Sequence, residues 1–178
     1  MKTRKLLFTL AATMTMLFGL TLTAHAEEAP APATKVVGVE GIGTFTVPAD
    51  WTEEYIEGYG TYWFNPTKTV SVAMSTTGEL PGENPPIDIY AAIEKTNLEE
   101  FGVTVLNWQI TKYFDHDAVD YLVYSPGNSS SPVMTTENFC YGHEYYSGNS
   151  IMDAGCIATT TEEFQAVLPV LATYQPAQ

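Results

Sequence analysis

Two pairs of side chains have types and a spacing that could do chemistry in this 178-residue chain. The first pair is Cys140 and Cys156, and the second, lying between them, is His143 and Asp153. A β-hairpin centred on Gly148 would place the two members of each pair opposite one another on neighbouring strands. The cysteines could then form a disulfide. The histidine could act as a base or a metal ligand held by the carboxylate.

For Cys140 and Cys156 we favour the disulfide, because an even number of cysteines in an exported chain is typical of a covalent cross-link. Such a bond would close a loop of about 16 residues and stabilise the fold by roughly 3 kcal/mol. The alternative is a nucleophilic thiol at Cys140, assisted by His143. These two residues are three positions apart, so on a strand they point to opposite faces, which argues against catalysis.

The pair of His143 and Asp153 has a catalytic and a structural interpretation. A hydrolase would need a nucleophile as well, and Ser147 and Ser150 are close in the sequence. However, no Gly-x-Ser-x-Gly motif positions a serine, and no second histidine has a defined spacing. We therefore favour a surface pair near the tip of a hairpin.

An acidic stretch, Asp115-His116-Asp117 with Asp120 nearby, is the third group with possible chemistry. A two-residue turn would be formed by Asp115 and His116 themselves. Asp117 and Asp120 would then lie on opposite faces of the following strand. The chain contains no spacing typical of a zinc or calcium site. We predict no metal site here and no cofactor.

The aromatic stretch near residue 60 is the best candidate for a binding surface. Aromatic rings beside carboxylates are typical of grooves that hold sugars or peptides. The alternative is that these rings simply cover a sheet. The candidate residues are Tyr55, Tyr59, Tyr62, Trp63, Glu53 and Glu57.

The first residues resemble a secretory signal peptide. Lys2, Arg4 and Lys5 precede the apolar run Leu6–Leu22, which ends at the small-x-small pattern Ala24-His25-Ala26. We expect cleavage after Ala26 and a secreted or periplasmic protein; an uncleaved membrane anchor is the alternative. Residues 27–35 should form a Pro/Ala-rich tether, followed by a single domain over 36–176.

Without residues 1–26, the chain has four lysines, no arginine and 21 acidic residues, a formal charge of −17. Binding of nucleic acid depends on lysine and arginine at phosphates, so this balance argues against it. An anionic membrane surface is excluded by the same sign of charge. We expect a protein partner with a basic or neutral surface, and at most weak association of divalent cations.

The pattern of apolar residues predicts an α+β fold. Alternation over 43–47, 61–64, 70–75, 106–114 and 117–123, and a long hairpin over 133–158, indicates strands. Periodicity near 3.6 over 87–101 and 160–171 indicates helices, the second of them capped by Thr160. We expect an antiparallel sheet of about seven strands with two main helices packed against it.

One segment carries a resemblance to a known family. Gly43–Trp51, Gly-Thr-Phe-Thr-Val-Pro-Ala-Asp-Trp, is similar to the opening of the PsbP-like superfamily, although Asp50 stands where glycine is usual there. The resemblance implies the fold and provides no shared catalytic residues. The sequence thus favours an exported, non-enzymatic binding or accessory module. The alternatives are a hydrolase using His143 and Asp153, or a purely structural envelope or stress protein.

Overall fold

The computed structural model describes residues 33–79, 84–127 and 136–177 of the chain. The strands are β1 (Thr34–Val39), β2 (Gly43–Pro48), β3 (Thr52–Ile56), β4 (Gly60–Phe64), β5 (Val70–Glu79), β6 (Thr104–Tyr113), β7 (His116–Pro126), β8 (Glu137–Ser147), β9 (Ser150–Ala158) and β10 (Gln175–Pro176). The helices are α2 (Ile87–Glu100) and α3 (Thr161–Leu171).

The predicted signal peptide, 1–26, lies outside the described residues, as does most of the predicted tether. Three residues of that tether, 33–35, are described, and Thr34 and Lys35 begin strand β1. None of the helices in the described ranges is long and apolar enough to cross a membrane.

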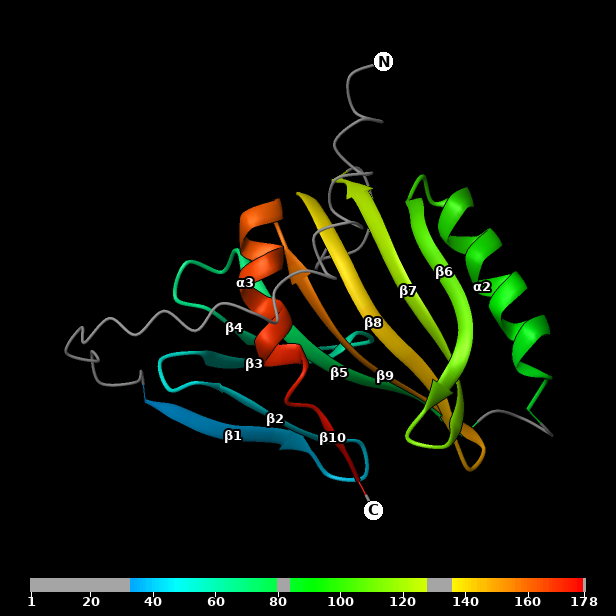
Figure 1. Cartoon of the computed structure of the whole chain (residues 1–178), viewed down its shortest axis with the longest axis horizontal. Coiled ribbons are helices and arrows are strands. Elements are labelled where there is room, and N and C mark those ends of the chain that lie inside the picture. Colours follow the sequence, from blue (N-terminus) through cyan, green and yellow to red (C-terminus); the bar gives the residue numbers. More distant parts are fainter. Residues whose placement is uncertain (1–32, 80–83, 128–135, 178) are drawn as a thin grey trace, which may run out of the picture. The chain divides into compact units, whose positions relative to one another are not determined.

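The strands form two antiparallel sheets (Figure 1). The large sheet has seven strands in the order β3-β4-β5-β9-β8-β7-β6, and the small sheet has the order β1-β2-β10. The predicted α+β class, with seven antiparallel strands and two helices, is confirmed. The predicted strand at 43–47 is β2, and it belongs to the small sheet instead of the large one.

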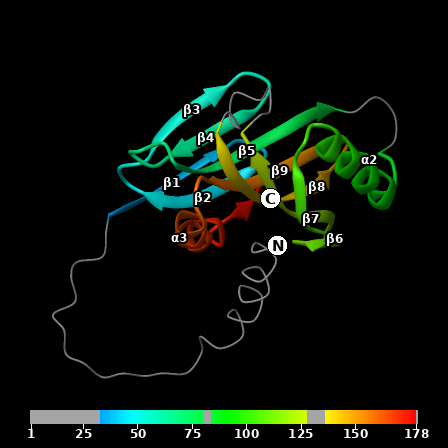
Figure 2. The ribbon, with the colours of Figure 1, turned by 90° about the horizontal axis from the view of Figure 1, so that it is seen from above.

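The two helices cover opposite faces of the large sheet (Figures 1 and 2). Helix α2 packs on β6 and β7, and its Tyr90 reaches Glu144 of β8. Helix α3 packs on β5 and β9, and its Phe164 contacts Tyr141 of β8. Residues 141 and 144 of one strand point to opposite faces, which fixes the two helices on opposite sides. Below, these are called the α2 face and the α3 face.

The main core fills the space between the α3 face, helix α3 and the small sheet. Trp63 of β4 is completely buried there, and its ring meets Phe45 of β2 edge-to-face at 6.4 Å. The indole Nε1 of Trp63 donates a hydrogen bond to Glu53 at 2.9 Å, so its polar atom is satisfied. Burial of such large side chains is what holds the small sheet and α3 against the large sheet, at about 1.5–3 kcal/mol for each.

The ends of helix α3 follow the sequence prediction. The backbone N–H of Glu163 donates to the hydroxyl of Thr160 at 3.2 Å, which is the expected N-terminal cap. The helix continues to Leu171, two residues beyond Pro169. Pro169 lies in the last turn, so its missing N–H removes one helical hydrogen bond close to the point where the helix ends.

The β6–β7 hairpin has a different turn from the one predicted. Its turn residues are Phe114 and Asp115, with φ of 46° and 68°, and Tyr113 pairs with His116. Both positive φ values suit the tight turns that connect antiparallel strands. A turn at Asp115-His116 would have paired Phe114 with Asp117. The observed turn lies one residue earlier, so each of residues 107–113 of β6 pairs with a residue of β7 two positions from the predicted one. A shift of two keeps every side chain on its predicted face.

Candidate functional site

The second hairpin, β8–β9, corrects the pairing on which two sequence hypotheses depended. Its two-residue turn is Gly148-Asn149, so Ser147 pairs with Ser150 and Glu144 pairs with Asp153. The prediction had placed His143 opposite Asp153, which differs by one position. A shift of one moves a side chain to the other face of the sheet, so His143 and Asp153 point away from each other.

The predicted disulfide between Cys140 and Cys156 is wrong for the same reason. Cys140 pairs with Ile157, and Cys156 pairs with Tyr141, so the two cysteines lie on opposite faces of the sheet. Both are free and buried. Burial raises the pKa of the Cys156 thiol to about 12 and that of Cys140 well above its usual value. Neither thiol is prepared to act as a nucleophile.

The carboxylate partner of His143 is Asp120, on the neighbouring strand β7. The Nδ1 of His143 lies 2.5 Å from Oδ1 of Asp120, and Tyr113 stacks on the imidazole at 4.0 Å. Ser147 and Ser150 are the paired residues that flank the hairpin turn. The arrangement postulated for a hydrolase is therefore not assembled.

The acidic stretch at the β6–β7 turn brings no ligand set together. Asp117 forms an ion pair with Lys112 at 2.5 Å, and Asp120 is engaged by His143. In the described ranges, no three His, Cys, Asp or Glu side chains converge in a way that could hold a metal ion.

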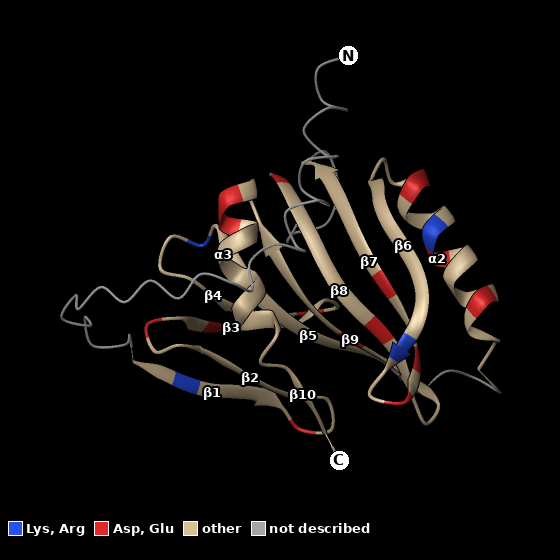
Figure 3. Cartoon of the chain, in the orientation of Figure 1, with Lys and Arg blue, Asp and Glu red and all other residues tan. Residues whose placement is uncertain are grey.

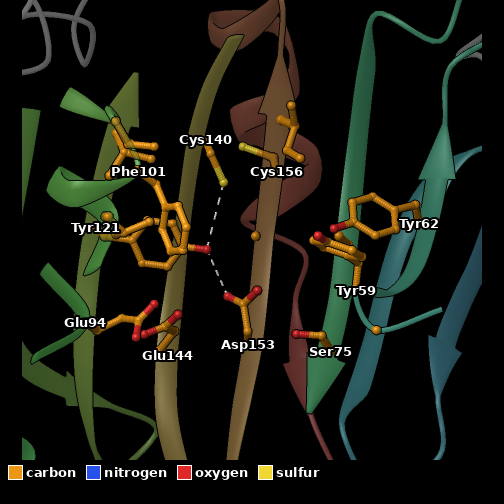
Figure 4. A pocket seen from close by; sticks show the side chains of 17 residues that line it. Tyr59, Tyr62, Ser75, Glu94, Phe101, Tyr121, Cys140, Glu144, Asp153 and Cys156 are labelled. Atoms are coloured by element: carbon orange, nitrogen blue, oxygen red, sulfur yellow. Dashed lines mark hydrogen bonds between the residues drawn. The ribbon is translucent and has the colours of Figure 1, made fainter. Parts of the chain in front are cut away.

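A groove on the α2 face is the best candidate for a functional site (Figure 4). Its volume is about 370 Å³. One wall comes from helix α2 and its end, and the other from the β3–β4 turn and β4; the floor is the large sheet. The residues that define its character are Glu94 and Phe101 on the first wall, Tyr59 and Tyr62 on the second, and Tyr121, Glu144 and Asp153 on the floor.

Two glycines make room for the floor of the groove. Gly142 and Gly155 pair across β8 and β9, and a Cβ at Gly142 would lie only 2.7 Å from the hydroxyl of Tyr121. The absence of side chains lets the Tyr121 ring lie over the strands. There its hydroxyl donates to Asp153 at 3.0 Å. Gly142 and Gly155 therefore allow Tyr121 to reach the carboxylate of Asp153 and hold it in place.

Three carboxylates line the groove. Glu144 and Asp153 are direct cross-strand partners on the α2 face, and the carboxylate of Glu94, from α2, lies beside that of Glu144 (Figure 4). The hydroxyl of Tyr90 donates to Glu144 at 2.9 Å. Like charges directly opposite each other on neighbouring strands are destabilising, so this arrangement is unfavourable for the fold alone.

The electrostatics of the groove favour the protonated forms of Glu144 and Asp153. Burial, and then the negative charge of Asp153, raise the pKa of Glu144 to about 8, although the hydrogen bond from Tyr90 opposes the shift. Burial, and to a lesser extent Glu94, raise the pKa of Asp153 to about 6 against the hydrogen bond from Tyr121. Among the described residues that line the groove, none is lysine, arginine or histidine. Within the described part of the chain, these carboxylates therefore share the groove with no cationic side chain.

A second, smaller hollow lies further along the same face. It has a volume of about 300 Å³ and shares Ile157 with the groove. Asn138, which lines it, is 1% exposed. Its Nδ2 donates to the carbonyl of Thr136 at 2.9 Å, whereas its Oδ1 receives no hydrogen bond within the described part of the chain. A buried acceptor without a donor costs about 1–3 kcal/mol.

The predicted aromatic surface is divided between the two faces. Tyr59 and Tyr62 line the groove. Trp63 lies on the opposite face, inside the core, and its indole donates to the exposed Glu53.

The other two predicted residues lie outside the groove lining. Tyr55, on edge strand β3, is 71% exposed, and Glu57 is exposed in the following turn. The acidic residues that complete the groove, Glu94, Glu144 and Asp153, were not in the predicted surface. The signal for two of them was available in the Gly148-Asn149 turn, which sets Glu144 opposite Asp153.

The described chain is an α+β protein whose fold is similar to that of PsbP, in agreement with the resemblance of its opening segment. A similar solved structure is the cyanobacterial PsbP of Synechocystis sp. PCC 6803. It has a TM-score of 0.55 and 8% identity over 87% of this chain and 99% of that one. Another is the Ran-binding protein Mog1p of Saccharomyces cerevisiae. Its TM-score is 0.50, with 9% identity over 82% of this chain and 96% of that one. No family model matches the sequence, and no curated protein matches it.

Proposed function

We propose that this chain is an exported, non-enzymatic binding module that holds a basic or neutral segment of a protein partner in the groove on its α2 face. The observation that carries the proposal is the composition of the groove. Glu94, Glu144 and Asp153 line the groove together with the aromatic wall of Tyr59 and Tyr62, and none of the described lining residues is a cation. A lysine or arginine side chain of a partner would supply the missing charge.

The chemistry of such a contact is favourable on two grounds. A hydrogen bond to a charged group contributes about 1.5–3 kcal/mol, more than a neutral one. An aromatic face within about 6 Å of a cation adds about 0.5–1 kcal/mol at an open site. Helices and strands of the domain carry more acidic residues than lysines (Figure 3), so the surrounding field would attract a basic segment and repel an anionic one. The name of Mog1p, a Ran-binding protein with a similar fold, supports a role in protein binding.

Calorimetric titration with a single-lysine ligand, N-acetyl-lysine amide, and with a lysine-rich peptide tests the proposal. Both should bind the described domain, the peptide more tightly at low salt than at high salt. Replacing Glu94 with glutamine should weaken binding at least fivefold. The matched control is Glu99→Gln, which removes the same charge from an exposed position on the same helix and should change affinity less than twofold.

Equal losses in the two variants would show that only the net charge matters and would refute the groove as the site. A glutamate-rich peptide of the same length should not bind. Tight binding of that peptide would contradict the proposal outright.

Export is tested separately. The intact mass of the protein recovered from outside the cytoplasm should correspond to a chain that begins at Glu27. Recovery of a species that keeps residues 1–26 would contradict cleavage and favour an anchored protein.

A further inference from the structure

The groove and the second hollow lie in line on the α2 face of the large sheet. Asn138 and Glu144 belong to the same strand, β8, and an even number of residues separates them, so their side chains point to the same face. The two hollows meet at Ile157 of β9. A ligand long enough to fill both would therefore run along the strands.

The two hollows require different groups from such a ligand. The groove presents carboxylates and calls for a cation. The second hollow contains Lys68 and Glu54, which pair with each other at 2.6 Å, so its charged groups are already balanced. Among the described residues, none donates a hydrogen bond to the buried Oδ1 of Asn138. A neutral N–H or O–H group fits that need.

The spacing selects the conformation of the ligand. Glu144 and Asn138 are six residues apart on a strand, which corresponds to about 20 Å. An extended peptide covers this length with about six to seven residues. A helix of seven residues spans only about 10 Å and could not reach both hollows.

We infer that the partner segment is an extended stretch of about seven residues, with a lysine or arginine in the groove at one end and an uncharged N–H donor to Asn138 at the other. The inference rests on the proposed function of the groove and adds the length, conformation and second contact of the segment. A single small amine would occupy the groove alone.

A length series on the wild-type domain tests the inference. The ligands are N-acetyl-lysine amide, a three-residue peptide and a seven-residue peptide, the peptides made of one terminal lysine followed by serine and threonine residues. The seven-residue peptide should bind at least tenfold more tightly than the other two, which should differ by less than threefold. Methylation of the backbone nitrogens in the last two residues of the long peptide should abolish its advantage.

A variant of the protein provides the second arm. Asn138→Leu keeps the size of the side chain and removes the acceptor, so it should reduce the affinity of the long peptide to that of the short one. Affinity for N-acetyl-lysine amide should stay within twofold of the wild-type value. If Asn138→Leu does not fold, the methylated peptide still removes the same hydrogen bond.

The outcomes separate this inference from the proposed function. Affinity that is independent of peptide length, or unaffected by methylation, overturns the inference, while binding of N-acetyl-lysine amide that is sensitive to Glu94→Gln upholds the groove. Failure of all three ligands to bind overturns both.

Discussion

Replacing Glu144 with glutamine should stabilise the folded domain at pH 8 and change its stability little at pH 4.5. In the folded chain the pKa of Glu144 is raised to about 8, chiefly by burial, whereas in an unfolded chain it is about 4.3. Between these values the folded state binds more protons than the unfolded state. Stability must therefore fall as the pH rises through this interval.

The size of the effect follows from the shift. A displacement of one pKa unit corresponds to about 1.4 kcal/mol, so the whole interval would correspond to roughly 5 kcal/mol. The side chain is half-buried and borders an open groove, and water there screens its charge. We therefore expect a gain of about 2–3 kcal/mol for Glu144→Gln at pH 8. Glutamine keeps an acceptor for the hydroxyl of Tyr90, so that hydrogen bond is not lost.

Urea unfolding at pH 4.5, 6, 7 and 8 provides the measurement, with Glu99→Gln as the control. The difference between Glu144→Gln and wild type should increase with pH, and the control should follow wild type throughout. A variant that is less stable than wild type at pH 8, or a difference that is constant with pH, would refute the reasoning. The same variant should lose affinity for N-acetyl-lysine amide, so that stability and binding change in opposite directions.

Three further predictions concern the frame of the site. Unfolding the chain without reductant should expose two thiols, Cys140 and Cys156, to a labelling reagent, and the folded chain should react with neither; absence of label after unfolding would restore the disulfide. Gly142→Ala should destabilise the domain by about 1–3 kcal/mol in urea unfolding, because the new Cβ displaces the Tyr121 hydroxyl; a neutral result would show that the floor has room. Thr160→Ala should cost about 1 kcal/mol by removing the cap of α3, and an equal cost for Thr160→Ser would contradict that explanation.

The two hairpins show what sequence patterns can establish. For β6–β7 the predicted turn at Asp115-His116 was displaced by one residue, because the turn uses Phe114 and Asp115, and phenylalanine is not a typical turn residue. Alternation of apolar residues fixes only which face a side chain occupies, and an error of two preserves that face.

For β8–β9 the error of one position had larger consequences. The pairing of Cys140 with Cys156 and of His143 with Asp153 followed from an odd-numbered loop, whereas Gly148-Asn149 forms a two-residue turn. Glycine followed by asparagine is a recognised signal for such a turn. A prediction based on that signal would have placed Glu144 opposite Asp153 and would not have paired Cys140 with Cys156.

Other features depend on contacts between distant segments. Glu94 reaches the groove from α2, and its neighbours on β8 and β9 are about 50 residues or more away in the sequence. Strand β10 has only two residues, Gln175 and Pro176, and exists because it completes the small sheet beside β2. No local pattern predicts either of them, since both result from packing.

The two faces of the large sheet differ in whether their polar side chains have partners. On the α3 face the polar side chains satisfy one another: His143 is paired with Asp120, the indole of Trp63 with Glu53, and Tyr145 with a second tyrosine. That face is closed by α3 and the small sheet, and satisfied polar groups are what a closed core requires.

On the α2 face the polar groups of the two hollows are left unbalanced. Within the described residues, Glu144 lies opposite Asp153 with no cation lining the groove, and the Oδ1 of Asn138 has no donor. Each feature makes the free domain less stable, and each would be relieved by one group of the same extended ligand. Helix α2 packs mainly on β6 and β7, and the groove lies between this helix and the β3–β4 turn. The α3 face thus provides the stability that allows the α2 face to keep groups suited to binding.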